Sequence, residues 1–131
     1  MAFADSAHAE AVIPVSDLQR GRDFYGGTLG FQILLDDPKL GLYIAAGGGS
    51  RFFVYQSVGA GQSRATLAGF VVDDLDAAMA ELRGKGVTFE EYDLPELKTE
   101  NGVAELAGIR SAWFKDPDGN ILSVGEPPPT D

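Results

Sequence analysis

The sequence predicts an α+β fold built from two tandem copies of one βαβββ unit. Residues 12–18 and residues 69–75 are both short apolar runs that end in Asp-Leu, and the second begins 57 residues after the first. A helical pattern follows each segment, and runs with strand character follow each helix. A single helix cannot cover both faces of the sheet in its unit. Two paired units are therefore expected to form a curved, cup-shaped mixed sheet with flanking helices.

The first module is expected to span about residues 10–57. Asp17 stands where its helical pattern begins, and a carboxylate there can accept hydrogen bonds from the free backbone N–H groups. Gly30 is placed to end this helix. Branched and aromatic residues then predict strands at residues 31–35, 41–46 and 51–57.

The second module is expected to span about residues 65–125, between a linker at 58–64 and a tail at 126–131. Asp74 and Gly86 correspond to the helix cap and stop of the first module. Strands are predicted at residues 87–89, 103–105, 110–115 and 120–124. The tight-turn sequence Asp-Pro-Asp-Gly at 116–119 makes the last two a hairpin. Residues 93–101 lack periodicity and are interpreted as a loop, either mobile at a pocket mouth or a plain surface loop.

Composition excludes several classes of function. The chain has 20 acidic and 10 basic residues, giving a net charge of −10, so its surface should repel nucleic acid. No apolar run approaches the roughly 20 residues of a membrane helix, and the N-terminus lacks a secretory pattern. The chain contains no cysteine, which excludes disulfides and thiolate chemistry and favours a cytoplasmic location. We expect no nucleic-acid or membrane partner.

Several motifs together resemble one superfamily. They are Val-Ser-Asp-Leu at 15–18, Phe-Tyr at 24–25, Leu-Gly-Phe at 29–31, Val-Asp-Asp-Leu at 72–75 and Ala-Trp-Phe-Lys-Asp-Pro-Asp-Gly-Asn at 112–120. Over about residues 10–125 the chain resembles the vicinal oxygen chelate superfamily, also called the glyoxalase, bleomycin-resistance and extradiol-dioxygenase superfamily. The resemblance implies paired βαβββ modules, a cup-shaped cavity for a small-molecule ligand and often a homodimer. It does not imply one reaction.

Enzymes of that superfamily hold a divalent metal with four side chains from the first and last strands of each module. The corresponding residues here are Glu10, Tyr55 or Gln56, Leu67 and Ser123. Leucine has no donor atom, and a neutral serine hydroxyl is a poor ligand for a divalent ion. We therefore predict that the metal centre is absent and that no cofactor is bound. The single histidine, His8, lies off this register and is interpreted as an exposed residue.

Strand alternation predicts which side chains face the cup. If the turn pairs Phe114 with Ile121, Phe114 faces the cup and Trp113 faces a helix, whereas a bulge would reverse this. Packing within the core is the alternative role for the aromatic candidates. The predicted ligand-binding residues are Glu10, Phe52, Val54, Tyr55, Gln56, Leu67, Ala112, Trp113, Phe114, Ile121 and Ser123.

Glu10 is the one candidate for catalysis, as a general base or as an anchor for a cationic ligand, because it would be an ionisable group in an apolar cup. If the first strand starts later, Glu10 is solvated instead. The first functional hypothesis is a metal-free protein that binds a small aromatic or amphipathic molecule. The alternatives are a metal-dependent lyase, isomerase or dioxygenase, and a metal-free enzyme that uses Glu10. The sequence leaves open whether any reaction is catalysed.

Overall fold

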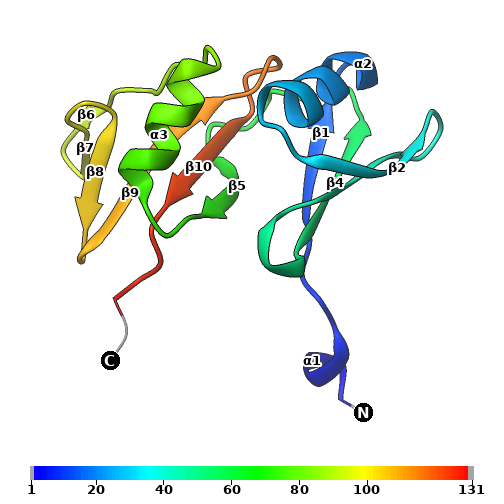
Figure 1. The fold of residues 1–131 in the computed structure, drawn as a ribbon, viewed down its shortest axis with the longest axis horizontal. Helices are drawn as coiled ribbons and strands as arrows, with labels where there is room; N and C mark the ends of the chain where they lie inside the picture. Colours follow the sequence, from blue (N-terminus) through cyan, green and yellow to red (C-terminus); the bar gives the residue numbers. More distant parts are fainter. Residues whose placement is uncertain (1, 130–131) are drawn as a thin grey trace.

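The computed structural model describes residues 2–129 and confirms the two tandem βαβββ modules, which lie side by side (Figure 1). Each module has a four-stranded mixed sheet in which the first and last strands are parallel neighbours. Within residues 2–129, no helix is long and apolar enough to cross a membrane.

The first module begins with β1 and folds its helical segment back over the sheet. Asp17 caps the helix as predicted, accepting hydrogen bonds from the backbone N–H groups of Gln19 and Arg20. The last part of the helical segment is a π-helical turn. The sheet order is β1-β4-β3-β2. Its elements are β1 (Ala11–Val15), α2 (Leu18–Gly21), η1 (Arg22–Thr28), β2 (Gln32–Asp37), β3 (Gly41–Ala45), a short turn η2 (Gly47–Gly49) and β4 (Arg51–Gln56).

The second module repeats this arrangement with the order β5-β10-β9-β8. Asp74 caps its helix by accepting a hydrogen bond from the Ala77 N–H group. A two-stranded hairpin lies within the segment 93–101 that was predicted to be a loop. The elements are β5 (Thr66–Val71), α3 (Leu75–Gly84), β6 (Asp93–Leu94), β7 (Leu97–Lys98), β8 (Val103–Leu106), β9 (Ile109–Lys115) and β10 (Ile121–Gly125).

The strand predicted at residues 87–89 is wrong. Phe89 forms one isolated bridge with Phe114, and β8 occupies the sheet position beside β9. Val87 and Phe89 are both buried, 9% and 7% exposed, whereas Thr88 between them is exposed. The segment therefore has the alternating burial of a strand, but it pairs with β9 only at the Phe89 bridge, where the Glu90 N–H donates to the Trp113 carbonyl at 2.7 Å.

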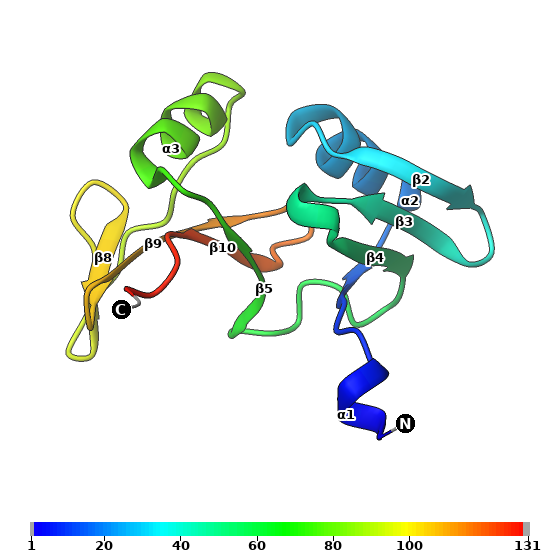
Figure 2. The ribbon, with the colours of Figure 1, turned by 60° about the horizontal axis from the view of Figure 1, so that its bottom comes forward.

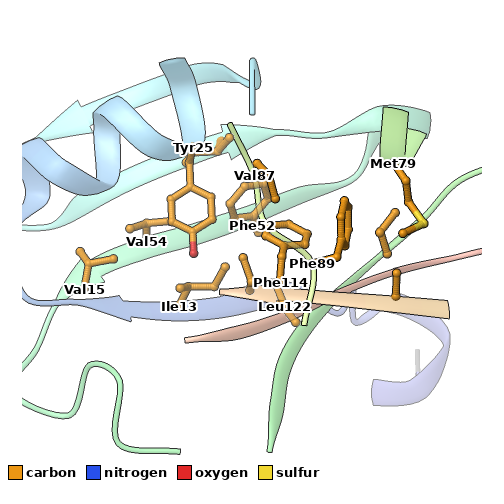
Figure 3. Close-up of a cluster of buried hydrophobic side chains, with 14 of the residues drawn as sticks. Ile13, Val15, Tyr25, Phe52, Val54, Met79, Val87, Phe89, Phe114 and Leu122 are labelled. Carbon is orange, nitrogen blue, oxygen red and sulfur yellow. The ribbon is translucent and has the colours of Figure 1, made fainter. Parts of the chain in front are cut away.

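Each sheet has one covered and one uncovered face, because both helical layers lie on the same side of the strands (Figure 2). The covered face holds the core, which runs from Ile13 and Val15 in the first module to Phe89 and Met79 in the second (Figure 3). The alternate residues of the strands point away from the helices. We call this second surface the open face; its residues are Val12, Pro14, Tyr43, Phe53, Tyr55, Leu67, Gly69, Val71, Ser111, Trp113 and Ser123.

A buried carboxylate joins the two modules. Asp116, which is 5% exposed, accepts hydrogen bonds from the Tyr25 hydroxyl at 2.7 Å and from the Asn120 side-chain amide at 2.8 Å. The same Asn120 amide also donates to the Pro14 carbonyl at 2.7 Å. Two residues further along the turn, Asp118 accepts from the Ser16 N–H group and from Arg20. The turn of the second module is thereby fixed to the start of the first helix.

Tyr25→Phe should lower the free energy of unfolding by about 1.5–3 kcal/mol, because it removes a hydrogen bond to a buried charged group. Denaturant unfolding followed by circular dichroism measures this change. Tyr43→Phe is the matched control, since Tyr43 lies on the open face and donates no hydrogen bond within residues 2–129. Equal effects of the two substitutions would contradict the role of the Tyr25–Asp116 contact.

The stabilising effect of the Tyr25 hydroxyl should also depend on pH. Burial, and then the negative charge of Asp116, raise the pKa of Tyr25 above its usual value of about 10. The protonated form is thus favoured in the folded state, so this contribution is complete below about pH 10 and decreases as the pH rises further. The stability advantage of the wild type over Tyr25→Phe should shrink between about pH 10 and pH 11, and a constant difference would contradict the assignment.

Candidate functional site

The open face of the first module carries a row of aromatic rings. The Tyr43 and Phe53 ring centroids are 4.8 Å apart, and Phe53 and Tyr55 lie nearly parallel at 5.9 Å. Gly41 has a positive φ of 132°, which favours glycine, and a Cβ there would clash with the Val54 carbonyl oxygen and lie 3.1 Å from the Phe53 ring. The Arg51 guanidinium lies 5.6 Å from the centre of the Tyr43 ring. These contacts form one aromatic wall with a cation at its end.

The open face of the second module carries the single tryptophan beside two small residues. The Trp113 indole N–H donates to the Thr66 hydroxyl at 3.1 Å, and the ring meets Tyr92 edge-on at 5.8 Å. Beside Trp113 lie Ser123 and Gly69, and a Cβ on Gly69 would be only 2.7 Å from the Ser123 hydroxyl. This second wall combines one large ring with exposed hydroxyl groups.

Tyr92 is a contact that sequence reasoning missed. It stands between the buried Phe89 and the β6–β7 hairpin, in a segment with no strand pairing in the main sheet. Burial, and then the charge of Glu90, raise the pKa of the Tyr92 hydroxyl, so it stays neutral beside Trp113 near pH 7. Its sequence position offered no periodic signal, and only the folded chain brings it to Trp113.

The expected pairing of Phe114 with Ile121 is wrong. Ile121 pairs with Lys115, and Ser123 pairs with Trp113, so Trp113 shares the face of Ser123. Phe114 and Ala112 point into the core instead, where they are 1% and 0% exposed. The turn is one residue shorter than the prediction assumed. Each side chain of β9 therefore points to the opposite face of the sheet from the one predicted.

The structure also decides which of Tyr55 and Gln56 lies on the open face of β4. Tyr55 pairs with Pro14 and lies on the open face, whereas Gln56 pairs with Val15 and lies on the other side. Phe52 and Val54 share the side of Gln56 and are buried in the core at 3% and 0% exposure. Placing them on the cup wall was therefore wrong. Ile121 is half-buried next to a bulge at the start of β10.

Glu10 does not stand as a free carboxylate. It lies one residue before β1, is half-buried, and forms an ion pair with Arg51 in which the atoms are 2.9 Å apart. The side chain is 25% exposed, so solvent screens the pair. The Glu10 carboxylate is therefore already engaged by a guanidinium. His8 is exposed, two residues earlier.

The residues at the four family ligand positions do not fit a divalent metal. They are Glu10, Tyr55, Leu67 and Ser123, and they supply one carboxylate, which is engaged by Arg51. Leu67 has no donor atom, and the tyrosine and serine donors are neutral hydroxyls. Among residues 2–129, no group of three or more His, Cys, Asp or Glu side chains gathers where it could hold a metal ion.

Comparison with known proteins identifies the family. The model of the glyoxalase/bleomycin resistance protein/dioxygenase superfamily matches residues 7–124. The chain belongs to this superfamily. Its sequence resemblance is thereby confirmed, although no curated protein matches the chain significantly.

Solved structures of the superfamily share its fold. TnmS3, an antibiotic binding protein from Streptomyces sp. CB03234, has a TM-score of 0.66 and 26% identity over 93% of this chain and 98% of its own. A glyoxalase/bleomycin resistance protein from the same organism has a TM-score of 0.63 and 28% identity, covering 90% and 100%. A superfamily member from Sphaerobacter thermophilus DSM 20745 has a TM-score of 0.69 and 28% identity, covering 92% and 98%.

Two hollows on the helical side are separate from the open face. An apolar crevice of about 220 Å³ lies between the modules, with Phe31, Phe70 and Phe114 among its lining residues. A polar hollow of about 900 Å³ lies between α3 and the edge of β8. Its arginine Arg110 is already paired with Asp76 at 2.8 Å, which lowers the pKa of that carboxyl group. Neither hollow contains an open-face residue.

This protein should not retain a divalent metal when it is purified. Purified protein should contain far less than one equivalent of zinc, nickel, manganese or iron by elemental analysis. Adding these ions should leave the melting temperature unchanged, because a ligand stabilises a protein only by binding its folded state. Stoichiometric retention of any of these metals would contradict the donor-set argument.

Proposed function

We propose that this protein binds a small aromatic or amphipathic molecule on its open face, without a metal, and that it does so in the cytoplasm. The observation that carries the proposal is the half-buried aromatic surface on an uncovered face of the two sheets. Val12, which is 51% exposed, pairs with Phe53, and Val71, which is 72% exposed, lies on the sheet that carries Trp113. Large exposed apolar patches of this kind mark binding surfaces.

The distribution of charge supports the same proposal. The chain has a net charge of −10, yet the central side chains of the open face are uncharged. Arg51 and Lys115 lie on the same side at the ends of β4 and β9, and each is paired with a carboxylate, of Glu10 and Glu90 respectively. Flat rings bind to aromatic walls by stacking and by edge contacts. The hydroxyl groups of Thr66, Ser123 and Tyr92 can accept or donate hydrogen bonds to polar groups of the same ligand.

The similarity to an antibiotic binding protein supports binding rather than catalysis. It agrees with the lack of a fitting metal donor set and with the engagement of Glu10 by Arg51. The absence of cysteine supports a reducing compartment.

Trp113 provides the direct test, because it is the single tryptophan of the chain and lies on the open face. Titration with 2-naphthol, acridine and anilinonaphthalene sulfonate, which represent neutral, cationic and anionic aromatic ligands, should give saturable quenching of its emission with at least one compound. Phe53→Ala should weaken that binding by about tenfold, since it removes an aromatic contact worth about 1.4 kcal/mol.

Leu40→Ala is the matched control for this titration. Leu40 is 50% exposed in the turn between β2 and β3, outside the open face, so its substitution should leave the affinity unchanged. Circular dichroism establishes that both variants remain folded. Failure of all three compounds to quench Trp113, or an equal loss of affinity in both variants, would overturn the proposal.

A further inference from the structure

We infer that the apolar crevice between the two helical layers is a second binding site, which takes a flat aromatic molecule that carries an amine. The crevice lies on the covered side of the sheets, and none of its lining residues belongs to the open face. The inference is therefore independent of the proposed function, and each can be tested without the other.

The crevice lies where the helices of the two modules stand apart. Figures 1 and 2 show α3 separated from the helical segment of the first module, on the same side of the strands. Leu29 and Phe31 line the crevice from the first module. Ala78 and Leu82, one helical turn apart, line it from α3. The small side chain of Ala78 fills little of the space between the two layers, which is about 220 Å³.

Aromatic rings make up much of the lining. Phe31 of the first module and Phe70 of the second are half-buried and stacked, with ring centroids 5.2 Å apart. The buried Phe52 meets both rings edge-on, at 5.3 Å and 5.6 Å, and supports them from the core side. Phe114 is the third ring of the lining. A flat ring that enters the crevice can therefore make stacking and edge contacts with side chains from both modules.

Water is held only weakly in this crevice. Within residues 2–129, every lining residue except Glu81 is apolar, whereas a well-held water needs about two to four polar partners. A ligand that displaces poorly held water with apolar atoms gains affinity. The volume suits one or two fused rings, since a cavity of roughly 150 Å³ lined by similar side chains takes up benzene.

Charge favours an amine over an acid. In the described part of the chain, Glu81 is the one charged residue that lines the crevice. Its carboxylate lies 3.4 Å from the Lys85 ammonium, one turn further along α3, but an exposed pair of this kind is weak. The Glu81 side chain is 67% exposed, so it remains accessible to the amine of a ligand. The net charge of −10 also attracts cations to the protein as a whole.

Isothermal titration calorimetry with naphthalene compounds of equal ring size tests the inference. The compounds are 1-naphthylmethylamine, 1-naphthalenemethanol and 1-naphthaleneacetate, which are cationic, neutral and anionic near pH 7. The amine should bind about threefold more tightly than the alcohol, and the acetate should bind most weakly. Glu81→Gln should remove the preference for the amine while the alcohol binds as before. Because Glu81 is exposed, this variant keeps the test valid if a change in the crevice itself prevents folding.

Ala78 and Ala77 provide a matched pair of substitutions. Ala78→Phe fills the crevice and should weaken binding of the amine by at least about tenfold. Ala77→Phe adds the same ring at the neighbouring position of α3, where the side chain is exposed and does not line the crevice. It should leave the affinity unchanged. Circular dichroism of both variants establishes that they are folded.

Phe53→Ala separates the crevice from the open face, because it removes the middle ring of the open-face aromatic row. At least one amine per chain should still bind to this variant with unchanged affinity. If Phe53→Ala abolishes binding and Ala78→Phe does not, the amine binds on the open face, so this inference fails and the proposed function stands. If Ala78→Phe abolishes binding while no compound quenches Trp113, the proposed function fails and the crevice site stands.

Three other results would overturn the inference. They are the failure of all three naphthalene compounds to bind the wild type, an equal loss of affinity in Ala77→Phe and Ala78→Phe, and tighter binding of the acetate than of the amine.

Discussion

The carboxylate of Asp116 is the contact on which the arrangement of the two modules depends. It is almost fully buried and accepts hydrogen bonds from Tyr25, Asn120 and the backbone N–H groups of Asp118 and Asn120. A buried charge is tolerated only when hydrogen bonds replace the lost water, and these four bonds come from both modules. Because Asn120 also donates to the Pro14 carbonyl, the turn before β10 is fixed to β1. The relative position of the two open-face walls follows from this one turn.

The alternation of side chains in each strand then separates the core from the open face. Phe52 and Val54 point under the helices, and Phe53 and Tyr55 point away from them, although all four are apolar or aromatic neighbours in one strand. A strand that is apolar on both sides is typical of a sheet covered on both faces. Here only one face is covered within the chain, and the proposed ligand binding uses the half-buried rings of the other face.

The residues at the family's metal-ligand positions support the proposed binding function. Leu67 and Ser123 remove two metal donors, and Arg51 neutralises Glu10, the remaining carboxylate. Substituting apolar or neutral groups for metal ligands makes the open face compatible with aromatic compounds, since no charge needs to be desolvated when such a compound binds. Gly41 and Gly69 contribute by leaving room for the Phe53 ring and for the Ser123 hydroxyl.

Local sequence signals determined the repeat, both helix caps, the Asp-Pro-Asp-Gly turn and the identity of the metal-position residues, because each depends on neighbours a few residues away. The superfamily followed from these signals. Four features were decided only by the tertiary structure. The register of β9 depends on where the turn closes, and a shift of one residue exchanges Trp113 for Phe114. Residues 87–89 have the burial pattern of a strand, but β8 takes their place in the sheet. The contact of Tyr92 with Trp113 and the pairing of Glu10 with Arg51 join residues distant in sequence, and no local pattern encodes such a meeting.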